Sequence, residues 1–135
     1  MRKSPLKRKS KTSVSKLKNK LWELCRAVAL IIYPHKCFTC GVHLQAGTSN
    51  MQLGHFIPSS TCGAFLRYDL RNLRWQCMRC NIHGGGQGAI FYKNLVEQEG
   101  QEYVDQLFKD KNIIVKADAQ FYEKNIEKLN EMLTK

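Results

Sequence analysis

The sequence predicts a small α+β fold, and three observations support this prediction. Apolar residues recur at helical spacing near both ends of the chain. Two short segments between them show the alternation of β-strands. Two Cys-x-x-Cys pairs, Cys37 with Cys40 and Cys77 with Cys80, bracket this middle region. Four thiolates in two close pairs suit a tetrahedral zinc ion, so we expect a zinc-stapled domain.

The N-terminal part of the chain divides into a basic arm and a helix. Residues 1–12 are rich in Lys, Arg and Ser, and we expect them to be disordered when unbound. A helix is predicted from Ser13, a suitable N-cap, to Pro34, which stops it. Residues 13–135 are interpreted as a single domain. The helix has one apolar face, formed by Leu17, Leu21, Leu24, Val28 and Ile31.

The middle of the chain is predicted to hold two strands and two metal-binding turns. Strand-like alternation covers Asn50–Ile57 and returns over Leu70–Gln76, with a loop over Pro58–Gly63. Each Cys-x-x-Cys is expected to form a zinc knuckle, a tight turn whose backbone amides point at the thiolates. The knuckle region spans residues 37–83, and Asn81 is expected to open a short helical turn after the second pair.

Three helices are predicted over residues 89–135. They cover Ala89–Gln98, which ends at Gly100, then Gln101–Lys109, and last about Asp118–Leu133. The last helix is acidic and amphipathic. It is a candidate contact for a homodimer. The alternative is that this helix caps the protein's own core.

The charge of the chain is unevenly distributed. The formal net charge is +11; residues 1–20 hold nine Lys or Arg residues and no acid, whereas residues 97–135 hold six basic and nine acidic residues. This asymmetry fits a polyanion partner, nucleic acid first, or simply a solvated basic surface. No apolar run is long enough for a membrane span and no signal peptide is evident, so we expect an intracellular protein. Cys25 and Cys62 are interpreted as buried thiols rather than disulfide partners.

A histidine and two asparagines lie close to the knuckles in sequence. Gly54-His55-Phe56 falls between the two pairs, Asn72 precedes the second, and Asn81 follows it directly. A lone His on a strand is usually a packed or solvated residue. In this combination it suits phosphodiester hydrolysis, because an imidazole can activate water near neutral pH. The reaction also needs a divalent cation, for which an Asn carbonyl oxygen is a suitable ligand.

These motifs resemble the His-Asn-His nucleases, also called His-Me finger or ββα-metal nucleases. They are more closely similar to the lambda-type NinG (Rap) recombination proteins, a family of structure-specific phage endonucleases. The resemblance covers about residues 13–100. The matching features are Cys37-Phe-Thr-Cys40-Gly41, Gly54-His55-Phe56, Leu66-Arg67-Tyr68-Asp69, Asn72, Gln76-Cys77-x-x-Cys80-Asn81, His83, Gly88 and Tyr92.

The resemblance implies a ββα-metal core between flanking helices, and a metal-dependent DNA endonuclease made by a phage in its bacterial host. Its expected substrates are branched recombination or repair intermediates such as Holliday junctions. His55 would be the general base, and Asn81 would bind a catalytic Mg²⁺ or Mn²⁺. Asn72 would orient His55 or its loop.

One departure from the family pattern concerns the catalytic metal. Many such nucleases place an acid or His directly before the catalytic His, and NinG-like proteins place an Asp three residues before it. This chain has Gly54 and Gln52 at those positions. His83, Asp69 and His55 itself are therefore candidates for the second metal ligand. A surface position for His83 and an ion pair between Asp69 and a nearby Arg are the alternatives.

Basic side chains near the knuckles and in the arm are candidate contacts to the DNA backbone. Arginine is suited to forked contacts with phosphate, and we expect about two of the four arginines to make them. The candidates are Arg67, Arg71, Arg74, Arg79, Lys7, Arg8 and Lys9. Two other functions stay open: a non-catalytic zinc-stabilised DNA-binding module, and an RNA-directed protein with the same knuckles.

Overall fold

A computed structural model describes the backbone of residues 5–134 and the side chains of residues 14–134. The chain divides into two compact units, whereas the sequence favoured a single domain over 13–135. The first unit combines the N-terminal part up to Val28 with the C-terminal part from Lys116, and the second comprises Ala29–Val115.

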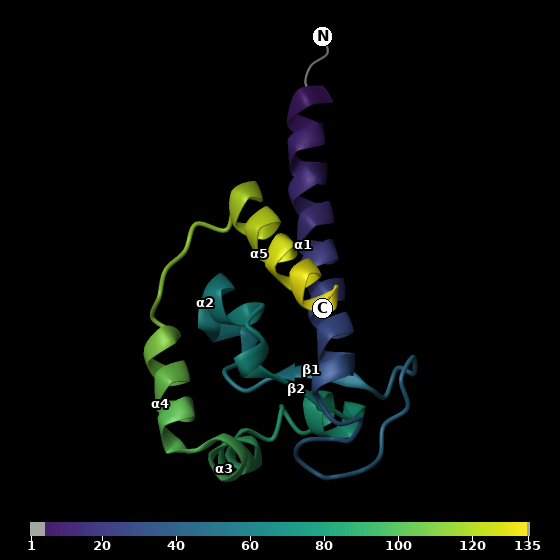
Figure 1. Cartoon of the computed structure of the whole chain (residues 1–135), viewed down its shortest axis with the longest axis vertical. Coiled ribbons are helices and arrows are strands. Elements are labelled where there is room, and N and C mark those ends of the chain that lie inside the picture. The colour runs from purple at the N-terminus through teal and green to yellow at the C-terminus, as the bar shows by residue number, and fades with distance from the viewer. Residues whose placement is uncertain (1–4, 135) are drawn as a thin grey trace. The chain divides into compact units, whose positions relative to one another are not determined.

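The first unit is built from two helices, α1 (Pro5–Ile32) up to Val28, and α5 (Ala119–Leu133) (Figure 1). Helix α1 begins before the predicted Ser13 and includes most of the stretch expected to be disordered; residues 1–4 lie outside the described residues. The start of α5 is confirmed, because the Asp118 side chain accepts a hydrogen bond from the Phe121 amide at 3.0 Å.

Most of the apolar face predicted for α1 is buried. Leu21, Leu24 and Val28 are buried, whereas Ile31, near the end of the helix, is 69% exposed. In α5 the buried side chains are Tyr122 and Leu129. Among the helices that the structure describes, none combines the length and the apolar character needed to cross a membrane.

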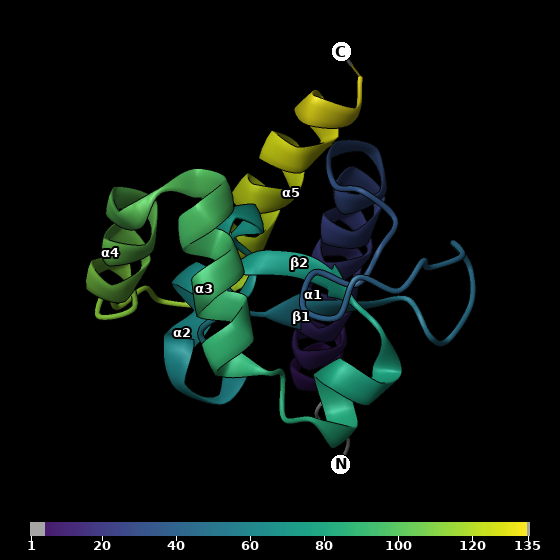
Figure 2. The ribbon, with the colours of Figure 1, turned by 90° about the horizontal axis from the view of Figure 1, so that it is seen from below.

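The second unit contains a two-stranded antiparallel sheet, β1 (Gln52–His55) and β2 (Leu73–Gln76) (Figure 2). Gln52 lies opposite Gln76 and His55 lies opposite Leu73. Both strands are shorter than predicted. In the second, the 3-10 turn η1 (Leu70–Asn72) occupies the start of the predicted strand. All four residues of β2 are buried.

The loop predicted over Pro58–Gly63 is wrong. Helix α2 (Ser59–Arg67) begins there, with Pro58 as its N-cap and a hydrogen bond from the Cys62 amide to the Pro58 carbonyl. Proline is favourable at a helix start, because its missing amide would be unsatisfied there anyway. The helix is kinked at Gly63, whose φ of 71° suits glycine.

Two further helices, α3 (Gly88–Glu99) and α4 (Gln101–Asp110), complete the second unit and contact each other (Figure 2). Their predicted positions are confirmed, and Gly100 separates them with a φ of 98°. The core connects these helices with α2 and with the segment after β1. It consists of Phe56, Ile57, Cys62, Leu66, Phe91, Leu95, Val104 and Leu107.

Candidate functional site

The two Cys-x-x-Cys pairs form the expected knuckle turns. The Cys40 amide donates to the Cys37 sulfur at 3.4 Å, and the Cys80 amide donates to the Cys77 sulfur at 3.5 Å. An antiparallel bridge between Lys36 and His43 closes the first turn. In both turns, therefore, a backbone amide stabilises negative charge on the first sulfur of the pair, as the sequence predicts.

The four sulfurs have the spacing of a tetrahedral metal site. They all lie within 4.8 Å of one another, and the Cys40 and Cys77 sulfurs are 3.8 Å apart. A zinc ion with Zn–S bonds of about 2.3 Å requires sulfurs about 3.8 Å apart. The quartet can therefore hold a structural metal such as zinc. Cys25 and Cys62 are buried outside it, as expected of core thiols.

The thiols of this quartet differ in acidity. Burial raises the pKa of Cys37, but the Thr39 hydroxyl and neighbouring backbone amides outweigh burial and lower the pKa to about 6. Burial, helped by the neighbouring thiols, raises the pKa of Cys80 to about 12. Cys37 is therefore ready to bind a cation as a thiolate, whereas full ionisation of the quartet needs the cation itself.

His55 ends strand β1 and is oriented by a backbone carbonyl. Its Nε2 lies 3.0 Å from the Arg67 oxygen in α2. A carbonyl can only accept, so Nε2 carries the proton and Nδ1 carries the lone pair in the neutral ring. Burial lowers the pKa of His55 below its usual 6.5. The ring is thus held as a neutral base at physiological pH.

Asn72 fixes the segment that follows His55. It is fully buried, its Oδ1 accepts the Ile57 amide at 2.8 Å, and its Nδ2 donates to the Ile57 carbonyl at 3.1 Å. Its own carbonyl accepts the Phe56 amide at 2.8 Å. Asn72 therefore lies where it can position the loop after His55, which is the role that the family resemblance implies.

Asn81 lies in the π-helical turn η2 (Arg79–His83), directly after the second knuckle. Its Nδ2 donates to Gln52 Oε1 at 2.9 Å, and its Oδ1 lies beside Gly54. Successive side chains of a strand point to opposite faces, so Asn81 and His55 approach the end of β1 from its two faces.

The two other candidate metal ligands lie in different surroundings. Asp69 caps η1 and forms an ion pair with Arg71 at 2.6 Å. Such an ion pair is the alternative to metal binding that the sequence left open for Asp69. His83 is exposed and lines a separate pocket with Cys40 and Arg79. Among the described His, Cys, Asp and Glu side chains, the four cysteines are the group close enough to hold a metal. A ligand role for Asp69 or His83 stays a prediction.

The four candidate arginines differ in accessibility. The structure corrects the prediction that Arg74 contacts DNA. The Arg74 side chain is buried, pairs with Glu99 at 3.1 Å and donates to the Tyr33 hydroxyl at 2.8 Å. In the folded chain, this arginine is therefore a buried structural residue. Arg79 is exposed, whereas Arg67 and Arg71 are partly buried. The side chains of Lys7, Arg8 and Lys9 lie outside the described residues.

Sequence reasoning gave no role to Gln76, although the motif contains it. Gln76 is fully buried in β2, opposite Gln52. A polar amide at the end of the buried run Leu73–Gln76 is the signal that could have drawn attention to it, because buried polar groups need partners.

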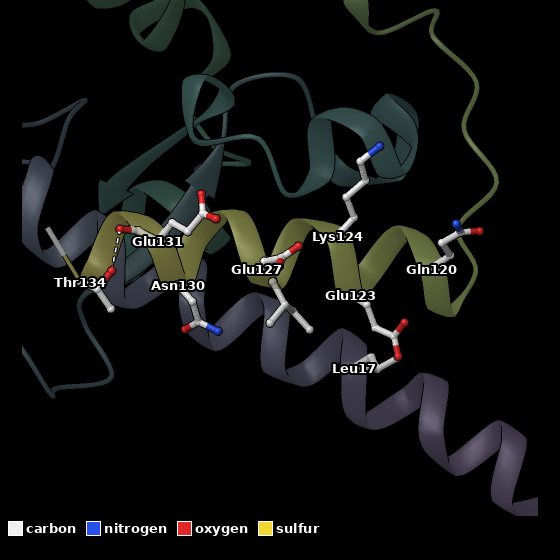
Figure 3. A pocket seen from close by; sticks show the side chains of 9 residues that line it. Leu17, Gln120, Glu123, Lys124, Glu127, Asn130, Glu131 and Thr134 are labelled. Carbon is white, nitrogen blue, oxygen red and sulfur yellow. Dashed lines mark hydrogen bonds between the residues drawn. The ribbon is translucent and has the colours of Figure 1, made fainter.

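The first unit contains a pocket of about 780 Å³ that is lined mainly by α5, with Leu17 on α1 (Figure 3). Asn130 and Glu123 point towards α1, whereas Lys124 points away from it (Figure 3). Three glutamates line this pocket, Glu123, Glu127 and Glu131. This charge has the wrong sign for contact with a phosphate backbone.

Comparison with known proteins identifies the family. The model of a family described as the bacteriophage lambda NinG protein matches residues 1–132. The chain belongs to the NinG family. Over 76 residues it is 32% identical to protein ninG of Escherichia phage 933W and of Enterobacteria phage VT2-Sa, and 30% identical to that of Escherichia phage lambda.

The match to these NinG relatives is partial. The aligned segment covers 56% of this chain and 36% of the phage 933W protein, so the chain spans about a third of the length of that relative. No solved structure matches the chain. Family membership therefore supports a phage protein, and the activity has to be argued from the site.

Proposed function

We propose that this NinG-family chain is a metal-dependent DNA endonuclease that acts on branched recombination or repair intermediates. The observation that carries the proposal is the setting of His55, whose Nε2 is held by the Arg67 carbonyl while burial keeps its pKa low. The paired strands β1 and β2 precede the turn η2 that contains Asn81, which is the order expected of a ββα-metal core, although here α2 and η1 lie between the two strands.

His55 would act as the general base. Its Nδ1 takes a proton from a water molecule, the water oxygen attacks phosphorus, and the bond from phosphorus to the 3′ oxygen breaks. The leaving 3′ oxygen takes a proton from solvent, which gives a 3′ hydroxyl and a 5′ phosphate. A bound Mg²⁺ or Mn²⁺ would neutralise charge on the phosphate and stabilise the leaving oxygen.

The other side chains of the site would bind and orient. Asn81 supplies a hard oxygen of the kind that such a cation prefers. Asn72 keeps the loop after His55 in place through its two hydrogen bonds with Ile57. Exposed Arg79 and the basic N-terminal arm would contact phosphates without reading base sequence, which suits recognition of DNA shape.

Gln52 and Gly54 favour a second candidate function. Neither residue carries charge at the positions where related nucleases have an acid or a histidine, so a non-catalytic zinc-stabilised DNA-binding module is the competing proposal. The two candidates make opposite predictions for cleavage and the same prediction for binding. An RNA-directed protein is the third possibility, which an RNA substrate tests.

One assay separates these functions. The full zinc-loaded chain is incubated with Mg²⁺ or Mn²⁺ and a fluorescent four-way junction, a matched duplex, or an RNA hairpin. Nicking of the junction in preference to the duplex is expected, with loss of nicking in EDTA and in His55→Ala. Metal-independent binding of the junction without any nicking would favour the non-catalytic module instead.

Symmetric resolution of a junction needs two nicks, and we infer that two chains act together. The expected result is a light-scattering mass of two chains on one junction. A single chain on each junction that still makes paired nicks would contradict the homodimer. Helices α5 and α1 belong to the same compact unit. This supports the alternative that α5 caps the protein's own core.

A further inference from the structure

A cavity of about 300 Å³ lies beside the first knuckle, within the second unit. Ligand pockets usually measure about 300–1,000 Å³, so this cavity suits one flat ring system better than a long ligand. Three aromatic side chains and a buried arginine line it, together with an exposed lysine and an exposed glutamine. These side chains belong to Tyr33, Phe38, Trp75, Arg74, Lys36 and Gln98.

The aromatic wall of this cavity is held in place before any ligand arrives. The Phe38 amide donates to the Trp75 carbonyl at 2.8 Å, and Asn94 Nδ2 donates to the Phe38 carbonyl at 2.8 Å. The Trp75 indole donates to the Ala29 carbonyl at 3.0 Å. Tyr33 and Phe38 are half-buried, so part of each residue stays accessible. A preorganised wall favours the binding of a flat ring, because little side-chain freedom is lost on binding.

The terminal nitrogens of Arg74 already have partners, so this side chain supports the Tyr33 ring rather than binding a ligand. Nη1 donates to the Tyr33 hydroxyl and to the Leu73 carbonyl, both at 2.8 Å. Nη2 donates to Glu99 at 3.1 Å and to the Tyr103 hydroxyl at 3.2 Å. Arg74 Cζ also lies 4.3 Å from the centre of the Tyr33 ring. The Tyr33 ring is thereby fixed both at its hydroxyl and at one face.

Two polar side chains of the cavity can serve a ligand. Lys36 is exposed and forms no ion pair with the acids that the structure describes. Gln98 is exposed too, and its Oε1 accepts from Arg74 Nε at 3.4 Å. This contact directs the Gln98 oxygen towards Arg74 and leaves Gln98 Nε2 as a donor. An ammonium group suits a phosphate, and a side-chain amide suits the edge of a nucleobase.

We infer that this cavity binds one unpaired nucleobase of the DNA. Tyr33 and Phe38 contact the base, Gln98 donates to its edge, and the Lys36 ammonium group binds the adjoining phosphate. The inference rests on the proposed function and deepens it, because it names the feature of branched DNA that the protein recognises. Charge favours nucleic acid over an aromatic side chain of another protein, since residues 29–96 hold six basic residues and one acidic residue.

The cost of exposing a base explains why this cavity favours branched DNA. In a continuous duplex each base is paired and stacked, and its extraction costs unpairing and unstacking energy. A base in a single-stranded flap or at an unpaired branch point has already lost these contacts, so it enters the cavity more easily. Stacking on aromatic side chains tolerates any base, which fits recognition of DNA structure rather than sequence.

Tryptophan fluorescence tests the cavity without any need for cleavage. The chain has two tryptophans, so Trp22→Phe leaves Trp75, which lines the cavity, as the reporter. The full zinc-loaded chain with this substitution is titrated with deoxyadenosine 5′-monophosphate. Saturable quenching is expected, because the bound base lies beside Trp75. Deoxyribose 5-phosphate, which lacks the base, should not quench, and equal quenching by both compounds would overturn the inference.

Substitutions on this Trp22→Phe background assign the contacts. Gln98→Ala and Lys36→Ala, at exposed positions that should tolerate change, are each expected to weaken nucleotide binding about three- to tenfold. Gln45→Ala and Lys93→Ala, exposed and outside the cavity, are the matched controls and should keep the parent affinity. Phe38→Leu, with its zinc content checked, should weaken binding about tenfold because the ring is lost. Parent affinity in both Gln98→Ala and Lys36→Ala, or in zinc-loaded Phe38→Leu, would overturn the inference.

A DNA measurement tests the preference for an unpaired base. 2-Aminopurine, a fluorescent analogue of adenine, is placed in the single-stranded arm of a flap or at a paired position of the matched duplex. The zinc-loaded chain is added without Mg²⁺ or Mn²⁺, so that the DNA stays uncut. The emission should change for the flap and not for the duplex, and equal changes would overturn the inference. Quenching of Trp75 by N-acetyltyrosinamide but not by the nucleotide would assign the cavity to a protein side chain and overturn it as well.

The failures of the inference and of the proposed function are distinguishable. Nucleotide binding that weakens in Gln98→Ala and Lys36→Ala, in a chain that cuts no DNA, supports the base cavity and rejects the nuclease. A chain that cuts branched DNA while Trp75 responds to no nucleotide supports the nuclease and rejects the base cavity.

Discussion

The amide side chain of Asn72 forms two hydrogen bonds with the backbone of one residue, Ile57, accepting from its nitrogen at 2.8 Å and donating to its oxygen at 3.1 Å. A side-chain amide paired with a backbone amide in this way acts like one more rung of the sheet. It extends the pairing of β1 with the segment before β2 beyond His55. The position of His55 is therefore fixed on both sides along the chain.

Loss of Asn72 should destabilise the second unit. Asn72→Ala leaves the Ile57 amide and carbonyl unpaired in the core, and we expect a loss of about 2–4 kcal/mol in the free energy of unfolding. Asn112→Ala, at an exposed position, is the control and should change this free energy by less than about 0.5 kcal/mol. Urea unfolding of the zinc-loaded proteins measures both, and equal stability of the two variants would contradict the role of Asn72.

One zinc ion should be bound by each chain. Replacing any one of Cys37, Cys40, Cys77 and Cys80 with Ser should remove the metal and unfold the knuckle region, because metal binding contributes to folding. Cys25→Ser and Cys62→Ser should keep the metal, since these thiols lie outside the quartet. Elemental analysis checks the prediction, and a folded wild-type protein free of zinc would refute it.

His55 should determine the pH dependence of cleavage. The neutral ring is the base, and burial lowers its pKa below 6.5, so the cleavage rate should rise with pH, reach half its maximum below pH 6.5 and stay level above. His55→Ala should lower the rate about 100-fold or more while DNA affinity stays near that of wild type. A half-maximal rate above pH 7.5 would point to a different base.

Substitutions at Arg74 and Arg79 should have different effects, the first on stability and the second on DNA binding. Arg74→Ala should cost about 2–4 kcal/mol of unfolding free energy, because it removes the ion pair with Glu99 and the buried guanidinium that donates to the Tyr33 and Tyr103 hydroxyls. Arg79→Ala, at an exposed position, should leave stability within about 0.5 kcal/mol of wild type and weaken DNA binding. Calorimetry and fluorescence anisotropy measure the two effects, and unchanged stability of Arg74→Ala would contradict the core role.

The basic arm should contribute to the salt dependence of DNA binding. Deleting residues 1–12 removes six Lys or Arg residues, and each lost phosphate contact should flatten the plot of log affinity against log salt by about 0.9. The double variant Lys124→Ala and Lys128→Ala, on acidic α5, should leave the slope unchanged. An unchanged slope after the deletion would show that the arm does not touch the DNA backbone.

Features encoded by local sequence were predicted well. The N-cap Asp118 and the glycine at 100 act through their own backbones and immediate neighbours, so they fixed the ends of α5 and α3. The spacing of each Cys-x-x-Cys likewise determines its knuckle turn. The loop prediction at Pro58 was wrong because proline starts helices as well as loops, and the apolar contacts of Cys62 and Leu66 favour the helix.

Features that depend on pairing across the fold could not be predicted. Arg74 looks like a surface cation in sequence, and only the aromatic and acidic side chains brought to it from 25 or more residues away explain its burial. The approach of the Gln76 and Asn81 side chains to Gly54 depends on the register that sets Gln52 opposite Gln76. A shift of one residue would turn Gln76 to the other face of the sheet.

The wide separation of the two knuckles sets an order of events during synthesis. Thirty-six residues lie between Cys40 and Cys77, which a ribosome adds in about 2–7 s. The first pair of thiols therefore leaves the ribosome well before its partners exist and must stay reduced until they follow. Metal capture can be completed only after β2 has been made, so maturation of this chain is linked to the supply of zinc and the redox state of the cell at that moment.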